Sequence, residues 1–179
     1  MECVMNSKKI IQLSTTQKIM LSFLCAILVG SFLLALPISS ATGEAVPYID
    51  ALFTATTSIC VTGLVTVPTY STWSVWGQIV ILFLIQLGGL GVITVMYGWM
   101  LQDVFNLNNI SGIVKFLRKV LIGTLVVEGC GALLYMTVFV PGYGLRGIWI
   151  SIFNAVSAFC NAGMDIMAED SLCGYVFQP

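Results

Sequence analysis

The stretch Ala51-Leu-Phe-Thr-Ala-Thr-Thr-Ser-Ile-Cys-Val-Thr-Gly-Leu64 decides how the rest of the sequence is interpreted. It begins as a short apolar helix, passes through a cluster of hydroxyl residues and breaks at Gly63. Long hydrophobic segments flank it on both sides, where the loop of a soluble protein would be polar. Irregular backbone at membrane depth is tolerated only where it is buried in protein or lines a water-filled path, because its polar groups need partners.

The same pattern returns one hundred positions later as Ser151-Ile-Phe-Asn-Ala-Val-Ser-Ala-Phe-Cys-Asn-Ala-Gly-Met164. The two stretches align without a gap. Each consists of a short helix followed by a glycine, and each follows its own hydrophobic segment, so together they form an internal repeat. The pairs that match are Phe53 with Phe153, Ala55 with Ala155, Thr57 with Ser157, Cys60 with Cys160, and Gly63 with Gly163.

The residues after each short helix have the composition of an ion-filter loop. A cation filter uses a short run of backbone whose carbonyls replace the hydration shell of the ion. Glycine permits positive φ, which lets successive carbonyls face one axis. The alternative is that each glycine only caps the C-terminus of a buried helix. We predict that carbonyls of Val61, Thr62, Gly63, Asn161, Ala162 and Gly163 face the ion, with Leu64 and Met164 at the flanking edge.

The chain resembles the Trk/Ktr/HKT superfamily of potassium transporters from about Lys18 to Met167. The resemblance implies an all-α membrane protein built of repeated span–re-entrant pore helix–span units around one filter, with about 1.7 of the family's four units present. It also implies potassium as the transported ion, a homodimer, and a cytosolic regulatory subunit that binds nucleotide. The residues that carry it are 51–64, Leu87-Gly-Gly-Leu-Gly91, Phe105-Asn-Leu-Asn-Asn-Ile-Ser-Gly-Ile-Val-Lys-Phe116 and Ser157 to Asp165.

The composition excludes several function classes. Hydrophobic residues make up 58% of the 179 residues and charged residues 8%, whereas about a quarter of an ordinary soluble domain is charged. The chain has no histidine, which excludes Ser-His and Cys-His catalysis. No basic face exists for nucleic acid. We therefore expect that the chain is not an enzyme and that it carries no covalently bound cofactor. The six cysteines form no C-x-x-C pair, and we favour free thiols over a disulfide between Cys60 and Cys160.

Three hydrophobic segments are long enough to cross a bilayer, and two short helices are not. The predicted spans are Ile19–Ile38, Val75–Tyr97 and Val120–Val140. The predicted pore helices are Pro47–Ser58 and Arg146–Phe159. An N-terminal signal peptide is the alternative for the first span. The glycines of Gly88-Gly89-Leu-Gly91 predict close helix contact, or else a bend or unwound turn in the second span.

Six of the seven basic residues lie before the first span or between the second and third. By the positive-inside rule, this places the N-terminus in the cytoplasm and both filter loops on the outside of a multi-pass plasma-membrane protein. We divide the chain into a first unit, 1–100, an apparently shortened cytoplasmic linker, 101–119, and a second unit, 120–179, which lacks its closing span.

Glu128 lies inside the third predicted span, where a carboxylate is expensive and normally faces protein or water. We expect it to brace the back of a pore helix or to tune the cation path; neutralisation by protonation is the alternative.

The predicted function is potassium uptake through a backbone-carbonyl filter, with the lipid bilayer as the surroundings. Sodium or mixed cation transport is an alternative within the family. The second alternative is a non-conducting membrane fragment or assembly partner, in which both glycines are packing features. Two filter loops offer half of a fourfold ring, so we expect that this chain alone does not conduct.

Overall fold

The computed structural model describes residues 15–105 and 110–167. Within these ranges the chain is helical and forms no β-strand; Ser40 and Trp73 make an isolated antiparallel bridge. The predicted all-α class is confirmed in this sense, and the number of repeat units stays a prediction. The elements are α1 (Thr15–Ala35), the 3-10 turn η1 (Pro37–Ser39), α2 (Tyr48–Cys60), α3 (Thr69–Thr72), α4 (Val75–Phe105), α5 (Ile110–Tyr143) and α6 (Leu145–Phe159).

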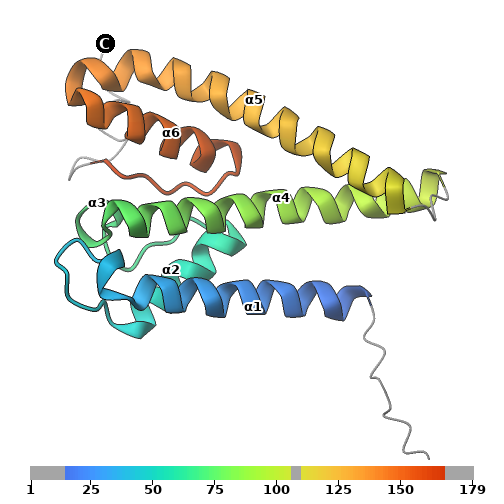
Figure 1. Ribbon diagram of the computed structural model, residues 1–179, viewed down its shortest axis with the longest axis horizontal. Coiled ribbons are helices and arrows are strands. Elements are labelled where there is room, and N and C mark those ends of the chain that lie inside the picture. The colour runs from blue at the N-terminus through green and yellow to red at the C-terminus, as the bar shows by residue number, and fades with distance from the viewer. Residues whose placement is uncertain (1–14, 106–109, 168–179) are drawn as a thin grey trace, which may run out of the picture.

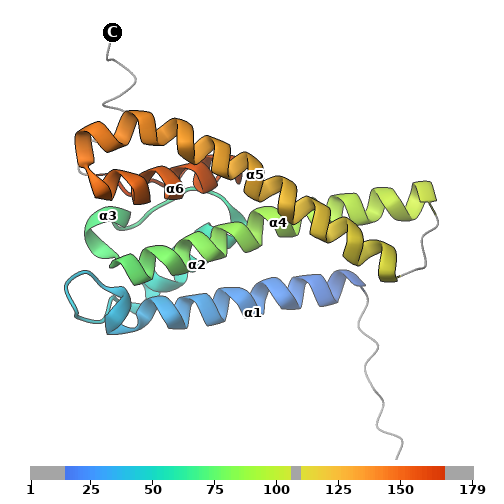
Figure 2. The ribbon, with the colours of Figure 1, turned by 45° about the horizontal axis from the view of Figure 1, so that its top comes forward.

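Three long helices form the body of the molecule and two short helices lie among them (Figure 1). Helices α1 and α5 run toward the same end, and α4 runs back between them. Helix α2 packs against α1 and α4, while α6 packs against α5 and α4. Both short helices begin at the end where α1 and α5 finish, and both stop near the middle of the long helices. Figure 2 shows the same order of helices from a second direction.

The observed helices are longer than two of the predicted spans. Helix α4 continues to Phe105, past the predicted end at Tyr97, and α5 begins at Ile110 instead of Val120. Hydropathy indicates where a helix is apolar, whereas good helix formers such as Met, Leu, Gln, Lys and Arg extend it into polar surroundings. Most of the predicted linker 101–119 is therefore helix. The N-terminal lysines before residue 15 and the end of the second unit beyond 167 lie outside the described residues.

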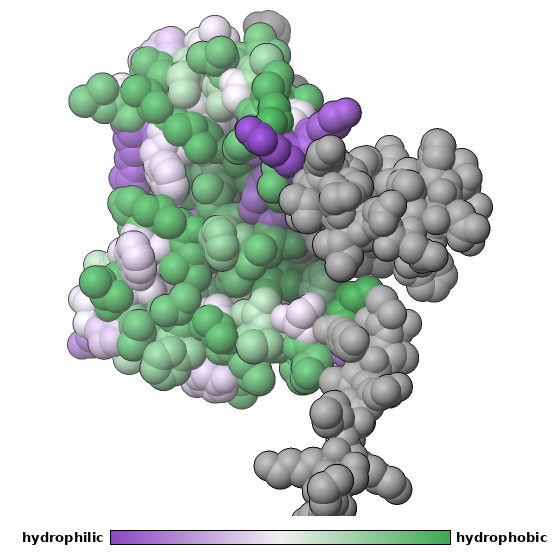
Figure 3. Space-filling view, turned by 45° about the vertical axis from the view of Figure 1, so that its right-hand side comes forward, coloured by the Kyte–Doolittle hydropathy of each residue, from purple (hydrophilic) through white to green (hydrophobic). Residues whose placement is uncertain are grey.

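The outer faces of α1 and α5 are apolar and exposed. Phe32 of α1 is 64% exposed, and Leu125 and Leu134 of α5 are 65% and 72% exposed. Among the described side chains, Arg118–Tyr143 is long and apolar enough to cross a bilayer, and Ile19–Ala35 and Val75–Gly91 are shorter apolar helices. Figure 3 shows a largely hydrophobic surface on one face. Large exposed apolar surfaces of this kind are rare on soluble monomers, and they fit lipid as the surroundings.

Glycines of α4 let three neighbours approach its backbone. A Cβ on Gly88 would lie 2.1 Å from the carbonyl oxygen of Ile59 at the end of α2, and a Cβ on Gly89 would lie 2.6 Å from the Cys160 sulfur after α6. Gly91 likewise contacts Phe23 of α1. The prediction of close helix contact is confirmed. The alternative prediction of an unwound turn here is wrong, because α4 is one continuous helix from Val75 to Phe105.

The buried core gathers where α2, α4 and α6 meet. Helix α2 has the spacing of an amphipathic helix, with Ala51, Ala55 and Ile59 all at most 1% exposed. Helix α6 contributes the fully buried Phe153, and Ile81 of α4 lies in the same cluster. Because the two short helices are fixed by this shared core, the loops that leave their C-termini are held close to one another.

Candidate ion-filter site

Two loops follow the short helices: the first loop, residues 61–68, leaves α2, and the second loop, 161–167, leaves α6. Their backbones bend in the same way. Val61 and Asn161 have positive φ angles of 55° and 61°, and Gly63 and Gly163 have φ angles of 75° and 67°. The repeat found in the sequence is therefore also a repeat of backbone conformation. Asparagine tolerates this left-handed region, whereas β-branched Val61 is an outlier there.

Matching hydrogen bonds hold both loops against their own helices. In the first loop, the N–H of Thr62 donates to the carbonyl of Thr57 at 3.0 Å, and the N–H of Leu64 donates to Thr57 Oγ1 at 3.0 Å. Thr57 Oγ1 also lies 2.6 Å from Thr62 Oγ1. One residue of the last turn of α2 thus fixes two backbone donors of the loop.

The second loop repeats this arrangement around Ser157. The N–H of Ala162 donates to the carbonyl of Ser157 at 2.7 Å, and the N–H of Met164 donates to Ser157 Oγ at 3.0 Å. The Ser157 hydroxyl in turn donates to the Met164 carbonyl at 2.5 Å. Ser157 and Thr57 therefore play the same part in the two copies.

The direction of these N–H groups determines the direction of the carbonyls. A trans peptide unit is planar, so the C=O of one residue points opposite to the N–H of the next. Peptide bonds in the described part of the chain are all trans. The N–H groups at 62, 64, 162 and 164 point back at their helices, and the carbonyls of the preceding residues must point away from them. Those carbonyls belong to Val61, Gly63, Asn161 and Gly163.

The two loops lie against one another. A Cβ built on Gly63 would be 2.3 Å from the carbonyl oxygen of Ala162 and 3.5 Å from the Cα of Gly163. The Ser58 hydroxyl, which donates to the Thr54 carbonyl at 2.6 Å, also lies 3.8 Å from the sulfur of Met164 across the same contact. The absence of a side chain at Gly63 is thus what allows the two loops to meet.

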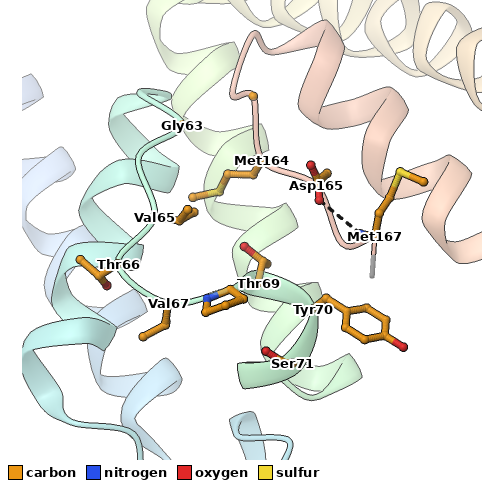
Figure 4. Close-up of a pocket in the computed structure, with 12 residues that line it drawn as sticks. Gly63, Val65, Thr66, Val67, Thr69, Tyr70, Ser71, Met164, Asp165 and Met167 are labelled. Carbon is orange, nitrogen blue, oxygen red and sulfur yellow. Dashed lines mark hydrogen bonds between the residues drawn. The ribbon is translucent and has the colours of Figure 1, made fainter. Parts of the chain in front are cut away.

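A cavity of about 680 Å³ lies beside this contact (Figure 4). Gly63, Gly163, Met164 and Asp165 line it from the two loops, and Tyr70 lines it from α3. Asp165 Oδ1 accepts the N–H of Met167 at 3.3 Å, which fixes the carboxylate within the second loop. Asp165 is the acidic residue of the cavity lining, and its charge favours cations there.

Arg146 and Tyr70 connect the two halves of the molecule at the end where both short helices begin. The Arg146 guanidinium donates to the Tyr70 hydroxyl at 2.9 Å and also stacks over the Tyr70 ring, 4.4 Å from its centroid. Such a cation–π contact contributes about 0.5–1 kcal/mol at an exposed site. It joins the start of α6 to the short helix α3 that follows the first loop.

The structure brings most of the predicted site residues together. Gly63, Ala162, Gly163 and Met164 lie at the contact between the loops, and Val61, Thr62, Leu64 and Asn161 belong to the same two loops. Sequence reasoning did not assign roles to Thr57 and Ser157, although the repeat paired them. It also gave no role to Asp165.

Glu128 lies in the middle of α5 and is 6% exposed. Its Oε2 accepts a hydrogen bond from Gln86 Nε2 of α4 at 3.3 Å. The expectation that this carboxyl group faces protein agrees with that contact. The cysteines within the described ranges, Cys25, Cys60, Cys130 and Cys160, are free thiols. The described part of the chain contains no group of three or more His, Cys, Asp or Glu side chains that could hold a metal ion.

Comparison with known proteins gives close relatives. The chain is 40% identical over 176 residues to the potassium/sodium uptake protein NtpJ of Enterococcus hirae. The matched region covers 90% of this chain and 39% of that protein. It is 35% identical over 186 residues to the Ktr system potassium uptake protein B of Bacillus subtilis, covering 96% of this chain and 41% of that protein. This chain is a homologue of the Ktr and NtpJ uptake proteins.

The Vibrio alginolyticus Ktr system potassium uptake protein B is a further relative, 33% identical over 176 residues, with 90% of this chain and 38% of that protein covered. The chain spans about two fifths of the length of these relatives. No family model matches it. The resemblance to the Trk/Ktr/HKT superfamily drawn from the motifs is confirmed by these relatives. Their role in potassium uptake agrees with the apolar, exposed helices described above, which fit a membrane.

Proposed function

We propose that this chain contributes to the uptake of potassium across the plasma membrane, with main-chain carbonyls of its two loops forming part of the selectivity filter. The observation that carries the proposal is the contact between two loops that share positive φ angles at two matching positions, a contact at which Gly63 faces the carbonyl of Ala162. Carbonyls that point away from their own helices are available to replace the water of a dehydrated cation.

The electrostatics of the site support the same role. Helices α2 and α6 both direct their C-termini at the loops, and a helix C-terminus carries a partial negative charge that favours a nearby cation. Asp165 adds a carboxylate to the adjoining cavity. The side chains supply position and charge and no bond is made or broken, so the chain acts as a transport protein and needs no bound cofactor; the potassium ion is its cargo.

The proposed roles follow the two loops. Carbonyls of Val61, Thr62 and Gly63, with those of Asn161, Ala162 and Gly163, bind the ion. Leu64 and Met164 flank the filter. Glu128 supports the second short helix from behind, through the neighbouring helix α4.

Topology and partners are part of the proposal. Helices α1 and α5 run in one direction and α4 in the other (Figure 1), which agrees with a multi-pass protein whose N-terminus is cytoplasmic and whose loops open outward. A homodimer and a cytosolic nucleotide-binding subunit are proposed from the family resemblance alone. The name Ktr system, carried by the relatives of Bacillus subtilis and Vibrio alginolyticus, agrees with assembly from several components.

The test is uptake by the complete gene product in a bacterial strain that lacks its own potassium uptake systems. We expect growth at low external potassium and accumulation of rubidium, a potassium substitute. Gly63→Ser should abolish both, while Gly43→Ser, which changes another glycine of positive φ with no neighbour within 4 Å, should leave them unchanged. Accumulation of sodium without rubidium would instead assign sodium as the cargo, in keeping with the name of the potassium/sodium uptake protein of Enterococcus hirae.

A further inference from the structure

Gln86 of α4 makes two side-chain contacts that connect α5 with the end of α6. Its Nε2 donates to Glu128 Oε2 at 3.3 Å. Its Oε1 accepts from the Cys160 thiol at 3.8 Å, a distance typical of a sulfur donor. The two ends of one amide therefore reach two different elements, and each end has a partner of the correct polarity.

Cys160 is the residue immediately before the second loop. Its sulfur lies in a notch of α4 formed by Gln86 and Gly89, which are three residues apart and so share one face of the helix. The notch exists because Gly89 has no side chain: a Cβ there would be 2.6 Å from the sulfur. The next residue is Asn161, where the backbone enters the left-handed region at a φ angle of 61°. A contact that fixes Cys160 therefore fixes the start of this bend.

Glu128 has a buried environment that orients Gln86. It lies in an apolar groove of about 490 Å³ whose lining residues come from α4, α5 and α6, and Gln86 is the other polar side chain of that lining. The second oxygen of Glu128, Oε1, is buried and has no hydrogen-bond partner in the described part of the chain. Gln86 thus supplies the hydrogen bond that this carboxyl group makes, and a buried polar group keeps such a bond because losing it is costly.

We propose that Gln86 is a positioning residue for the second filter loop, which it holds through Cys160 while Glu128 fixes the orientation of its amide. The inference rests on the proposed filter function and names a residue outside the loops themselves. The filter would then depend on a hydrogen-bonded chain from the middle of α5, through α4, to the first bend after α6.

The first measurement is the ratio of rubidium to sodium uptake by the complete gene product in the uptake-deficient strain. Gln86→Leu removes both contacts while preserving side-chain size, and it should lower the ratio about tenfold, the effect of losing one hydrogen bond to a charged group. Gln86→Glu sets two carboxyl groups side by side and should lower it as well. The double variant Gln86→Glu/Glu128→Gln restores one amide beside one carboxylate, and should return the ratio to within about threefold of wild type.

Gln78→Leu is the matched control. Gln78 lies eight residues earlier on the same helix, donates to the Trp73 carbonyl at 3.0 Å and accepts from Trp149 Nε1 at 2.8 Å. It is a buried glutamine with two partners and no contact to the second loop, so its loss should lower thermal stability and leave the ratio unchanged. An unchanged ratio in Gln86→Leu, equal losses in Gln78→Leu and Gln86→Leu, or no recovery in the double variant would each overturn the proposal.

The second measurement does not depend on transport. The rate at which a maleimide alkylates Cys160 in the purified protein, followed by mass spectrometry of the Cys160 peptide, reports whether the thiol is held. We expect faster alkylation in Gln86→Leu than in wild type and Gln78→Leu, and an equal rate in all three would refute the role of Gln86. If wild type takes up no monovalent cation while Gln86→Leu still exposes Cys160, the transport function fails and the contact stands.

Discussion

Replacing each filter glycine by alanine separates two effects that the structure assigns to different positions. Gly63 and Gly163 have similar φ angles, 75° and 67°, so alanine meets the same left-handed backbone in both, at about 1–2 kcal/mol. Their surroundings differ. A Cβ at Gly163 has no neighbour within 4 Å, whereas one at Gly63 would lie 2.3 Å from the Ala162 carbonyl oxygen. Relieving that contact requires the loops to separate, and overpacking of this kind typically adds about 1–3 kcal/mol.

We therefore expect Gly63→Ala to destabilise the protein by about 2–5 kcal/mol and Gly163→Ala by about 1–2 kcal/mol. The assay is thermal unfolding of the purified protein in detergent, followed by tryptophan fluorescence, together with the rubidium-to-sodium uptake ratio in cells. Gly43→Ala, with a φ angle of 77° and open space around it, controls for backbone strain alone and should match Gly163→Ala in stability. Only Gly63→Ala should both unfold early and lose ion preference through displacement of Ala162.

Equal destabilisation by the alanines at 63 and 163 would refute this reasoning, because it would mean that the two loops do not touch at Gly63. Wild-type uptake ratios in Gly63→Ala would refute the filter assignment even if stability fell as expected, since a displaced Ala162 carbonyl could then have no part in ion selection.

Three further sets of substitutions test the packing and the anchors of the loops. Gly88→Ala should destabilise by about 1–3 kcal/mol in the same unfolding assay because its Cβ would meet backbone 2.1 Å away; Gly123→Ala, with no neighbour within 4 Å, should be neutral, and similar losses in both would contradict the predicted contact. Ser157→Ala and Thr57→Val each remove a hydroxyl that anchors a loop, and each should cost about 1–3 kcal/mol and lower the uptake ratio; an intact ratio in both would exclude the anchoring role. Asn161→Val should cost about 1–2 kcal/mol of strain, whereas Asn161→Gly should be neutral; a stable valine variant would show that the loop does not keep its positive φ.

The repeat was sufficient to predict the two short helices and their loops. The pore helices expected at Pro47–Ser58 and Arg146–Phe159 agree closely with α2, Tyr48–Cys60, and α6, Leu145–Phe159. A glycine that breaks a short apolar helix is a local signal, and local signals survive in the fold. The contact between the loops is different, because it joins residues one hundred positions apart. Only the pairing of Gly63 with Gly163 suggested it, and no pattern indicated that Gly63 would face Ala162.

The ends of the long helices could not be predicted for a related reason. The hydropathy of a helix reflects the surroundings of its side chains, whereas the length of the helix depends on backbone propensity and packing. The segment around Phe105 and Ile110 is less apolar than the spans, and so it resembled a linker although α4 and α5 extend into it. Gln86 was missed because a single amide in an apolar helix gives no sign of its partners, and its two contacts come from α5 and from the end of α6.

The hydroxyl residues explain why the loop anchors were missed and how they could have been found. A hydroxyl in a helix usually bonds to the carbonyl one turn earlier, as Thr56 and Ser58 do with Leu52 and Thr54. Nothing in a single stretch distinguishes these residues from Thr57, which bonds to the loop instead.

The comparison of the two copies does distinguish them. Across the fourteen aligned positions from 51 to 64 and 151 to 164, only one carries a hydroxyl in both copies, and it holds Thr57 and Ser157. A hydroxyl that bonds within its own helix is replaceable, as Val156 at the place of Thr56 and Ala158 at the place of Ser58 demonstrate. One that holds a backbone N–H of the loop has no apolar substitute, because that donor would remain unsatisfied. The position that keeps its hydroxyl in both copies is thus the one on which the loop conformation depends.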